Sequence, residues 1–340
     1  MIKNFKNREI FFFFTQNKFK NLVFLFFIFI SFFSFLNFIT TNLVFQNSSE
    51  EIKEKFYNDN VFDIVSTLKD NRSLDGFEGG HSRHKLRWLY RYAESKVYET
   101  IFKITKNKPL MIYSLINTFY IFFAFFFSFL SISSLRKSLE SKDLILSGLF
   151  FFSFICLIFS YGYQTIFSVP ELLFVSMGIY YSLNSRIILF LLVMFLAVVN
   201  RESGIAVSLI YIILNHRKLY TYVLPLVAIA FLLIVNFDLV QNINIYKFST
   251  YFPINENYFE KEQESLKQII VFFIFILSFS SMVFSFIRFS DPIHYKLLLI
   301  FLLYTFIALF GTNLTNIFSL ILTIPSFTIL FFFFYDNLNK

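Results

Sequence analysis

The sequence has few of the residues that build redox, metal and nucleotide sites. Its one cysteine, Cys156, lies inside an apolar segment, so a disulfide framework and a cysteine-rich metal site are both excluded. Only eight of the 340 residues are glycines, and none forms a glycine-rich phosphate loop, which disfavours an ATPase or a cytoplasmic nucleotide-sugar enzyme. The sequence also lacks zinc spacing, an aromatic RNA motif and a soluble basic domain. The formal charge of +8 therefore does not indicate nucleic acid binding.

What the chain has instead is apolar sequence, with 56% hydrophobic residues and a mean hydropathy of +0.63. These values predict an all-α polytopic transmembrane helical bundle, residues 1–340 forming one integral membrane domain. Its first apolar stretch is too long for a signal-peptide core, so we expect an uncleaved first helix. We expect about ten passes, at Leu22 to Val44, Leu110 to Leu135, Leu144 to Tyr163, Val169 to Leu183, Ile187 to Val199, Gly204 to Leu214, Leu219 to Phe237, Ile269 to Ile287, Leu297 to Phe310 and Leu314 to Phe334.

The charges between these stretches predict an orientation in the cell inner (plasma) membrane. Six polar segments assigned to the cytoplasm carry 14 Lys and Arg against 5 Asp and Glu, whereas the rest of the chain carries 16 against 17. Because basic residues favour the cytoplasmic side, both termini are expected there, which requires an even number of passes. The six segments are Met1 to Asn21, Arg136 to Asp143, Asn184 to Arg186, Asn215 to Lys218, Arg288 to Lys296 and Tyr335 to Lys340.

Two larger polar segments are expected outside the cell. The first, residues 45–109, contains apolar residues at steps of three and four from Leu86 to Ile104, the pattern of an amphipathic helix lying on the membrane surface. The second, residues 238–268, carries more acidic than basic residues. Neither is expected to fold as an independent domain.

The most informative motif is Asn200-Arg201-Glu202-Ser203, which interrupts apolar sequence. Charge there costs several kcal/mol unless it faces protein or water. Because both flanking stretches are shorter than the ~20 residues of a straight crossing, they predict a broken-helix hairpin whose tip reaches the outer surface. The purely structural alternative is that Arg201 and Glu202 pair with each other while Ser203 caps the second helix.

A second motif places Arg83, Arg87 and Arg91 four residues apart, on one face of the predicted surface helix. Such a row suits a phosphate or pyrophosphate, which Arg binds in bidentate fashion, or the anionic headgroups of membrane lipid. His84 lies beside the row. Together with His81 it could ligate a metal, but no third ligand is evident.

Carboxylates supply the third feature. Asp59 and Asp63 follow the first helix and lie four residues apart, a spacing that suits a general base or a metal ligand. Glu171 stands within apolar sequence, yet Ser168-Val169-Pro170-Glu171 is a capping-box pattern with proline in the first turn, which favours a structural role. The sequence assigns no cofactor, and it leaves a divalent metal open.

Taken together, the loop aspartate Asp59, Arg87 in an Arg-Trp-Leu segment and the Asn200, Arg201, Glu202 motif resemble the C-type (GT-C fold) glycosyltransferase superfamily. The resemblance is closest to its bacterial polytopic proteins with an Asn-Arg-Glu-Ser/Thr signature. It implies a donor sugar on a polyprenyl phosphate in the outer leaflet and transfer to an extracytoplasmic acceptor.

The residues are compatible with that chemistry. Asp59, or Asp63 in its place, could deprotonate an acceptor hydroxyl, while Arg87, Arg91 and Arg201 neutralise the departing phosphate. A transporter or flippase of a lipid-linked or anionic substrate is the main alternative, because broken helices also build transport sites. A surface-glycan polymerase or ligase is another. The sequence does not indicate an oligomeric state.

The predicted orientation can be tested by labelling single cysteines, in a Cys156→Ser background, with a membrane-impermeant reagent. In intact cells, a cysteine at Ser73 should react, whereas cysteines at Ser138 and Arg217 should react only after the membrane is opened. Reaction from outside at Ser138 or Arg217 would contradict the orientation.

Overall fold

The computed structural model describes residues 18–39, 100, 109–136, 140–160, 168–200, 202–216, 218–235, 280, 292–311 and 317–338. Helices dominate this part of the chain, and it contains no strand. The elements are α2 (Lys18–Ile39), α6 (Pro109–Leu135), α7 (Ser141–Ser160), α8 (Ser168–Leu183), α9 (Ile187–Asn200), η4 (Glu202–Gly204), α10 (Ile205–Asn215), η5 (Leu219–Val223), α11 (Leu224–Val235), α14 (Pro292–Gly311), η8 (Ile317–Thr323) and α15 (Ile324–Leu338).

Nine of the ten predicted apolar stretches coincide with these helices. Three of the helices, at Asn21–Ile39, Ser114–Leu135 and Ser141–Phe159, are long and apolar enough to cross a membrane, and the other apolar helices are shorter. The predicted pass at 269–287 lies outside the described residues except for residue 280, and the loop at 238–268 lies wholly outside them. The described part of the chain is therefore all-helical, and its long apolar helices indicate a membrane protein, while the count of ten passes stays a prediction.

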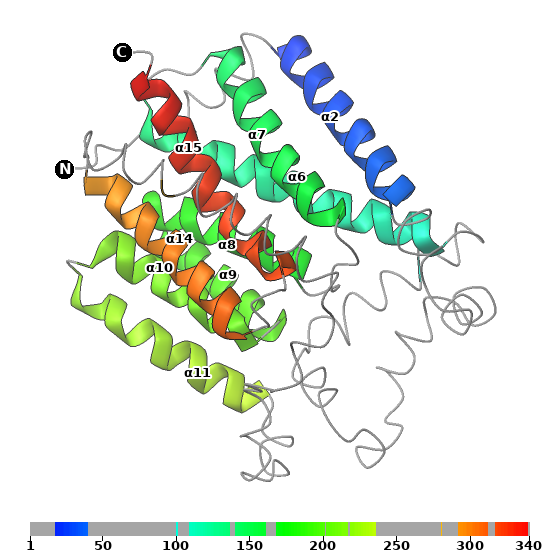
Figure 1. The fold of residues 1–340 in the computed structure, drawn as a ribbon. Helices are drawn as coiled ribbons and strands as arrows, with labels where there is room; N and C mark the ends of the chain where they lie inside the picture. The colour runs from blue at the N-terminus through cyan, green and yellow to red at the C-terminus, as the bar shows by residue number, and fades with distance from the viewer. Residues whose placement is uncertain are drawn as a thin grey trace.

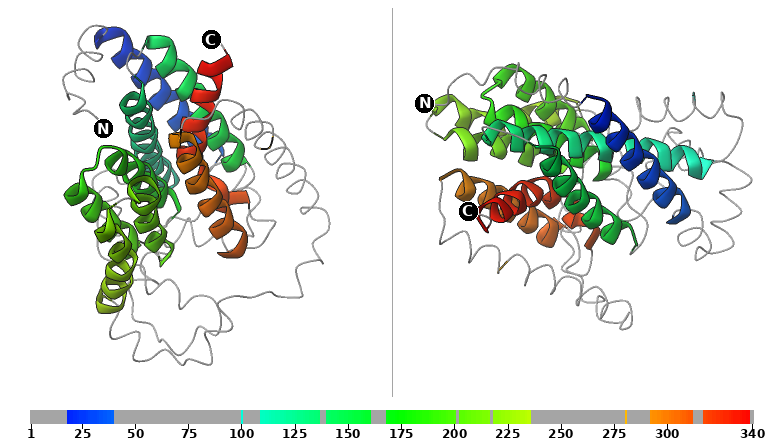
Figure 2. Two further views of the ribbon diagram at one scale, coloured as in Figure 1. Left: turned by 90° about the vertical axis from the view of Figure 1, so that its left-hand side faces the viewer. Right: turned by 90° about the horizontal axis from the view of Figure 1, so that it is seen from above.

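The helices pack side by side in a bundle whose two outermost members are α2 and α11 (Figures 1 and 2). α2 contacts α6 and α7, whereas α11 contacts α9 and α10. α8 lies between these groups and packs closely against α6 and α9, and no residue from Val169 to Leu183 is exposed. α14 and α15 cover the remaining side (Figure 2).

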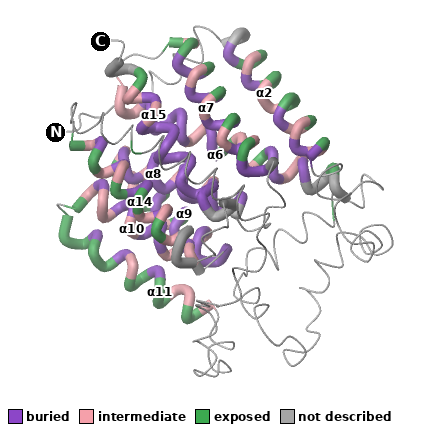
Figure 3. The backbone as a smooth tube through the Cα atoms, in the orientation of Figure 1, coloured by how far each residue is buried: buried purple, intermediate pink, exposed green. Residues whose placement is uncertain are grey.

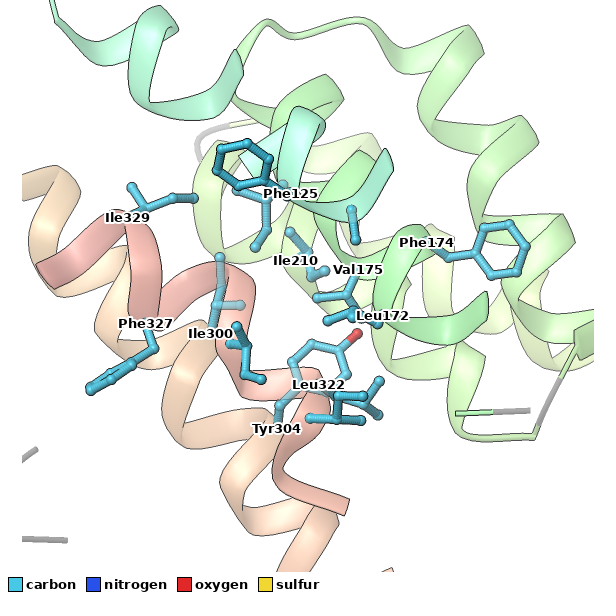
Figure 4. Close-up of a cluster of buried hydrophobic side chains, with 14 of the residues drawn as sticks. Phe125, Leu172, Phe174, Val175, Ile210, Ile300, Tyr304, Leu322, Phe327 and Ile329 are labelled. Carbon is cyan, nitrogen blue, oxygen red and sulfur yellow. The ribbon is translucent and has the colours of Figure 1, made fainter. Parts of the chain in front are cut away.

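The central helix α8 is the most buried, whereas the outer helices α2 and α11 each expose one side, as Figure 3 shows. The outer helices expose large apolar side chains, for example Phe27 at 65% on α2 and Ile234 at 71% on α11. Such faces would be unfavourable in water but suit lipid acyl chains, and the helical backbone satisfies its own polar groups. The core that the helices share includes Phe125, Ile210, Ile300 and Phe327 (Figure 4).

Polar side chains gather at one end of the bundle, which we call the polar end. Arg136 follows α6 and forms an ion pair with Asp143 of α7 at 2.8 Å, and its guanidinium lies 5.3 Å from the centre of the Phe332 ring on α15. The second carboxylate oxygen of Asp143 accepts a 2.7 Å hydrogen bond from the Glu140 backbone N–H, which caps α7. The ends of α6, α7 and α15 are thereby held together.

Further hydrogen bonds connect the other helices at this end. Each joins two segments that are distant in sequence: Ser141 Oγ to Asn21 Oδ1 (3.4 Å), Asn184 Nδ2 to Ser134 Oγ (3.0 Å), Asn215 Nδ2 to the Ser182 carbonyl (2.9 Å), Ser185 Oγ to Asn215 Oδ1 (3.2 Å) and Lys296 Nζ to the Leu214 carbonyl (2.8 Å). Five of the six segments that the charge pattern assigns to the cytoplasm therefore meet at the polar end. The last turns of α15 also lie at the polar end, because Phe332 contacts Arg136 there. These turns lead into the sixth cytoplasmic segment, which begins at Tyr335. Which side of the membrane this end faces stays a prediction.

Two ion pairs near the start of α7 offer a matched comparison. Arg136 and Asp143 are 21% and 5% exposed, whereas Lys142 and Glu140, 2.9 Å apart, are 71% and 61% exposed. Asp143→Asn should lower the free energy of unfolding by about 2 kcal/mol, because it removes the negative charge that faces Arg136 in a poorly solvated place. Lys142→Ala should change it little, because exposed pairs contribute little. Thermal unfolding in detergent measures both, and equal effects of the two variants would contradict this assignment.

Candidate functional site

The predicted broken hairpin is formed by α9 and α10, two short helices that follow each other in the sequence and pack against each other. The 3-10 turn η4 joins them at one end, and their other ends meet through Ser185 and Asn215 at the polar end. Gly204 makes the turn tight, because a Cβ atom there would overlap the Ala197 carbonyl of α9. A glycine is therefore needed for α10 to leave α9 at so short a distance.

The turn is tied to α8 by a side-chain hydrogen bond. Ser203 Oγ donates to Glu171 Oε1 at 2.7 Å, across 32 residues of sequence. Ser203 therefore does not cap α10 as the structural alternative supposed; the N-cap residue is Gly204, and no side chain caps it. Glu171 is fully buried, so its carboxylate lies inside the bundle and not on a solvent-exposed side of the first turn of α8.

Asn200 is the last residue of α9 and is also fully buried, so the first residue of the motif faces the protein interior. Arg201 and the side chain of Glu202 lie outside the described part of the structure. Of the motif's described side chains, Asn200 is therefore buried and Ser203 is partly buried and bonded to the start of α8.

Tyr304 of α14 is another buried polar residue near the start of α8. Its ring is fully buried, and its hydroxyl points toward Leu172 and Val175 of α8 (Figure 4). We call Glu171, Asn200, Ser203 and Tyr304 the Glu171 cluster. Sequence reasoning missed Tyr304, because a tyrosine within an apolar run carries no signal of its own.

The Glu171 cluster and the polar end lie at opposite ends of α8. Glu171 is in the first turn, whereas Ser182, whose carbonyl binds Asn215, lies eleven residues later, about 17 Å along the helix axis. α2 begins at the polar end, through Asn21, and α6 finishes there, through Ser134. α2 therefore ends, and α6 begins, toward the end that holds the Glu171 cluster, and residues 40–108 connect these two helix ends in the sequence.

The other predicted site residues belong to that segment. Asp59, Asp63, His84, Arg87 and Arg91 lie outside the described residues, as do the predicted surface helix and the 45–109 loop apart from residues 100 and 109. In the described part of the chain, no group of three or more His, Cys, Asp and Glu side chains could hold a metal ion. In comparisons with protein-family models, with curated proteins and with solved structures, nothing matches the chain.

The chemistry of the Glu171 cluster is that of hydrogen bonding to neutral polar groups. A carboxylate supplies acceptors only, a phenol and a serine hydroxyl supply donors and acceptors, and an amide supplies both. This combination suits hydroxyl-rich molecules. The cationic residues that suit a phosphate are the arginines of the loop and Arg201.

The tight turn gives a test of the hairpin. Gly204→Ala should lower the thermal unfolding temperature strongly, because the added methyl group meets backbone atoms that cannot move aside: the Ala197 carbonyl and the Val198 nitrogen. Gly148→Ala is the matched control, since its methyl group would meet only the ends of the Ile28 and Phe125 side chains, at 3.3 Å. A Gly204→Ala protein as stable as the Gly148→Ala protein would contradict the described turn.

Proposed function

We propose that this protein is a glycosyltransferase of the plasma membrane that moves a sugar from a polyprenyl-phosphate donor to an extracytoplasmic acceptor. The observation that carries the proposal is the position of the Asn200 to Ser203 motif. Ser203 of the motif is hydrogen-bonded to a buried carboxylate at the end of the bundle opposite the basic segments, the end toward which α2 ends and α6 begins, and the sequence with Asp59 and Arg87 connects those two helices. The charge bias predicts that this end lies outside the cytoplasm, where a donor in the outer leaflet would be within reach.

In this proposal the carboxylates act as bases and the arginines bind the phosphate. Asp59 is the leading base for the acceptor hydroxyl and Asp63 the fallback, because a hydroxyl is a poor nucleophile until its proton is taken. Arg87, Arg91 and Arg201 stabilise the negative charge that develops on the departing lipid phosphate, with His84 and Glu202 nearby in the site. The apolar helices hold the lipid tail. The fold of the C-type glycosyltransferases and the full count of ten passes belong to the same proposal.

One observation favours a second function, transport of a lipid-linked or anionic substrate. Glu171 is a fully buried ionisable residue beside two short helices joined by a turn, and transporters build their substrate sites from such parts. Transport and transfer differ in their product. A transporter moves its substrate across a sealed vesicle unchanged, whereas a transferase, polymerase or ligase makes a new glycosidic bond.

The full chain, purified and reconstituted in lipid vesicles, should transfer sugar from a polyprenyl-phosphate donor to an acceptor. Asp59→Asn should reduce turnover about 10²-fold or more with donor binding retained, since general bases typically contribute that much. Arg87→Ala should weaken donor binding, and Arg87→Lys should restore it only in part, because lysine lacks the bidentate fork.

Asp70→Asn, in the same loop, is the control and should keep full turnover. Full turnover in both Asp59→Asn and Asp63→Asn would remove the proposed base. Movement of the donor across the vesicle membrane without any transfer would establish the transporter instead.

A further inference from the structure

The turn between α10 and α11 carries exposed apolar and aromatic side chains at the polar end of the bundle. Leu219 is 85% exposed, and Tyr220, Tyr222 and Val223 are each about half exposed. Such a surface is unfavourable in water, but it suits the boundary of a bilayer, where tyrosine rings lie among the headgroups and aliphatic side chains reach the acyl chains. The exposed apolar face of α11 begins directly after this turn (Figure 3).

Hydrogen bonds hold the backbone of this turn in one shape. The buried Thr221 donates twice to the Lys218 carbonyl, from its backbone N–H at 2.9 Å and from Oγ1 at 2.8 Å. The Lys218 N–H donates to the Asn215 carbonyl at 3.1 Å, and the Tyr222 hydroxyl donates to the His216 carbonyl at 3.1 Å. The exposed side chains are therefore presented from a fixed backbone, which lowers the entropy lost when they bind a ligand.

Lys218 carries a positive charge on this turn. Its side chain is exposed and forms no ion pair with any of the described residues. Between residues 184 and 235 the sequence has one acidic residue, Glu202, which belongs to the turn at the other end of α9 and α10. At the start of α7, in contrast, the exposed Lys142 has the carboxylate of Glu140 at 2.9 Å. The described part of the chain therefore supplies no anion for Lys218.

A second cation lies on the neighbouring turn, which joins α8 to α9. Ser185 Oγ of that turn donates to Asn215 Oδ1 at 3.2 Å, and Asn215 Nδ2 donates to the Ser182 carbonyl at 2.9 Å. Arg186 follows Ser185 directly, and Lys218 follows Asn215 by three residues. Two turns that contact each other thus carry an arginine and a lysine, and neither contains an acidic residue.

We propose that the turns at 184–187 and 216–223 bind the headgroup of an anionic phospholipid. Lys218 and Arg186 hold its phosphate, which an ammonium and a guanidinium both bind well, and the exposed tyrosines and aliphatic side chains contact the headgroup layer and the acyl chains. A zwitterionic lipid binds less well, because its amine meets two cations and no carboxylate. A free phosphate ion leaves the exposed apolar side chains of the turn in water.

This inference does not depend on the proposed transfer reaction. The phospholipid binds at the opposite end of α8 from the Glu171 cluster, and it holds the turn between α10 and α11 at the surface of the bilayer. The predicted orientation puts it in the cytoplasmic leaflet, whose surface is negatively charged.

Native mass spectrometry of the full chain in a neutral detergent measures the dissociation constants for two added probes, dioleoyl phosphatidylglycerol and dioleoyl phosphatidylcholine. The parent should bind the phosphatidylglycerol about 10-fold more tightly or better. Lys218→Gln should weaken its binding about fivefold, which is the usual contribution of one basic residue near an anionic headgroup, and leave phosphatidylcholine binding unchanged. Arg186→Gln should have the same effect, and the double variant should lose the preference for the anionic lipid.

Lys142→Gln is the matched control. It removes the same charge from an exposed lysine at the same end of the bundle, but from one that already has Glu140 as its partner, so binding of both probes should stay nearly unchanged. Without added lipid, Lys218→Gln should unfold at the same temperature as the parent, because an exposed side chain without an ion pair contributes little to stability. A loss of binding in this variant is then not a loss of folding.

Three results would overturn the inference. Equal losses in Lys142→Gln and Lys218→Gln would mean that the lipid responds only to the total charge of the polar end. Equal affinity of the parent for the two lipids would mean that the turns do not select an anionic headgroup. Displacement of phosphatidylglycerol by inorganic phosphate would assign the cations to a free anion. None of these results bears on the proposed function, whose test is sugar transfer at the other end of the bundle.

Discussion

The cost of placing charged and hydrogen-bonding groups in hydrocarbon is the constraint on which this structure depends. Helices satisfy their own backbone, so the apolar runs of the chain can face lipid on α2 and α11. The polar side chains must then find partners inside the bundle or at its ends. Among the described residues, many serines and threonines bond to carbonyls of their own helix, for example Ser176 to Leu172. Bonds between different segments concentrate at the polar end and at the Glu171 cluster, and α8 reaches both.

The two places differ in what they are suited to do. At the polar end, side chains bind backbone carbonyls and one another, as Lys296 does at the end of α10 and Arg136 does with Asp143. Those bonds join the ends of helices that are distant in sequence. The Glu171 cluster instead ties a fully buried carboxylate to the turn that interrupts α9 and α10. The first arrangement joins helix ends, and the second fixes the hairpin turn to the start of α8.

Much of the helical framework could be predicted from the sequence, because length and apolarity decide it locally. The basic segments that the charge pattern assigns to the cytoplasm also lie together, at the polar end of the bundle. α14, however, begins at Pro292, earlier than hydropathy suggested, because Lys296 finds a carbonyl on α10 and His294 packs against Phe333. The bond between Ser203 and Glu171 could not be predicted, since the local pattern around Glu171 matches a capping box and its partner lies 32 residues away.

The central claim is that the end of the bundle with the Glu171 cluster receives the lipid-linked substrate and the polar end does not. Photocrosslinking the reconstituted protein with a prenyl-phosphate sugar that carries a diazirine next to the sugar, followed by peptide mapping, tests this most directly. The account predicts labels near the start of α8, the turn at 200–204 and the part of α14 around Tyr304. Labels concentrated at 134–143, 182–186 or 214–218 would contradict it.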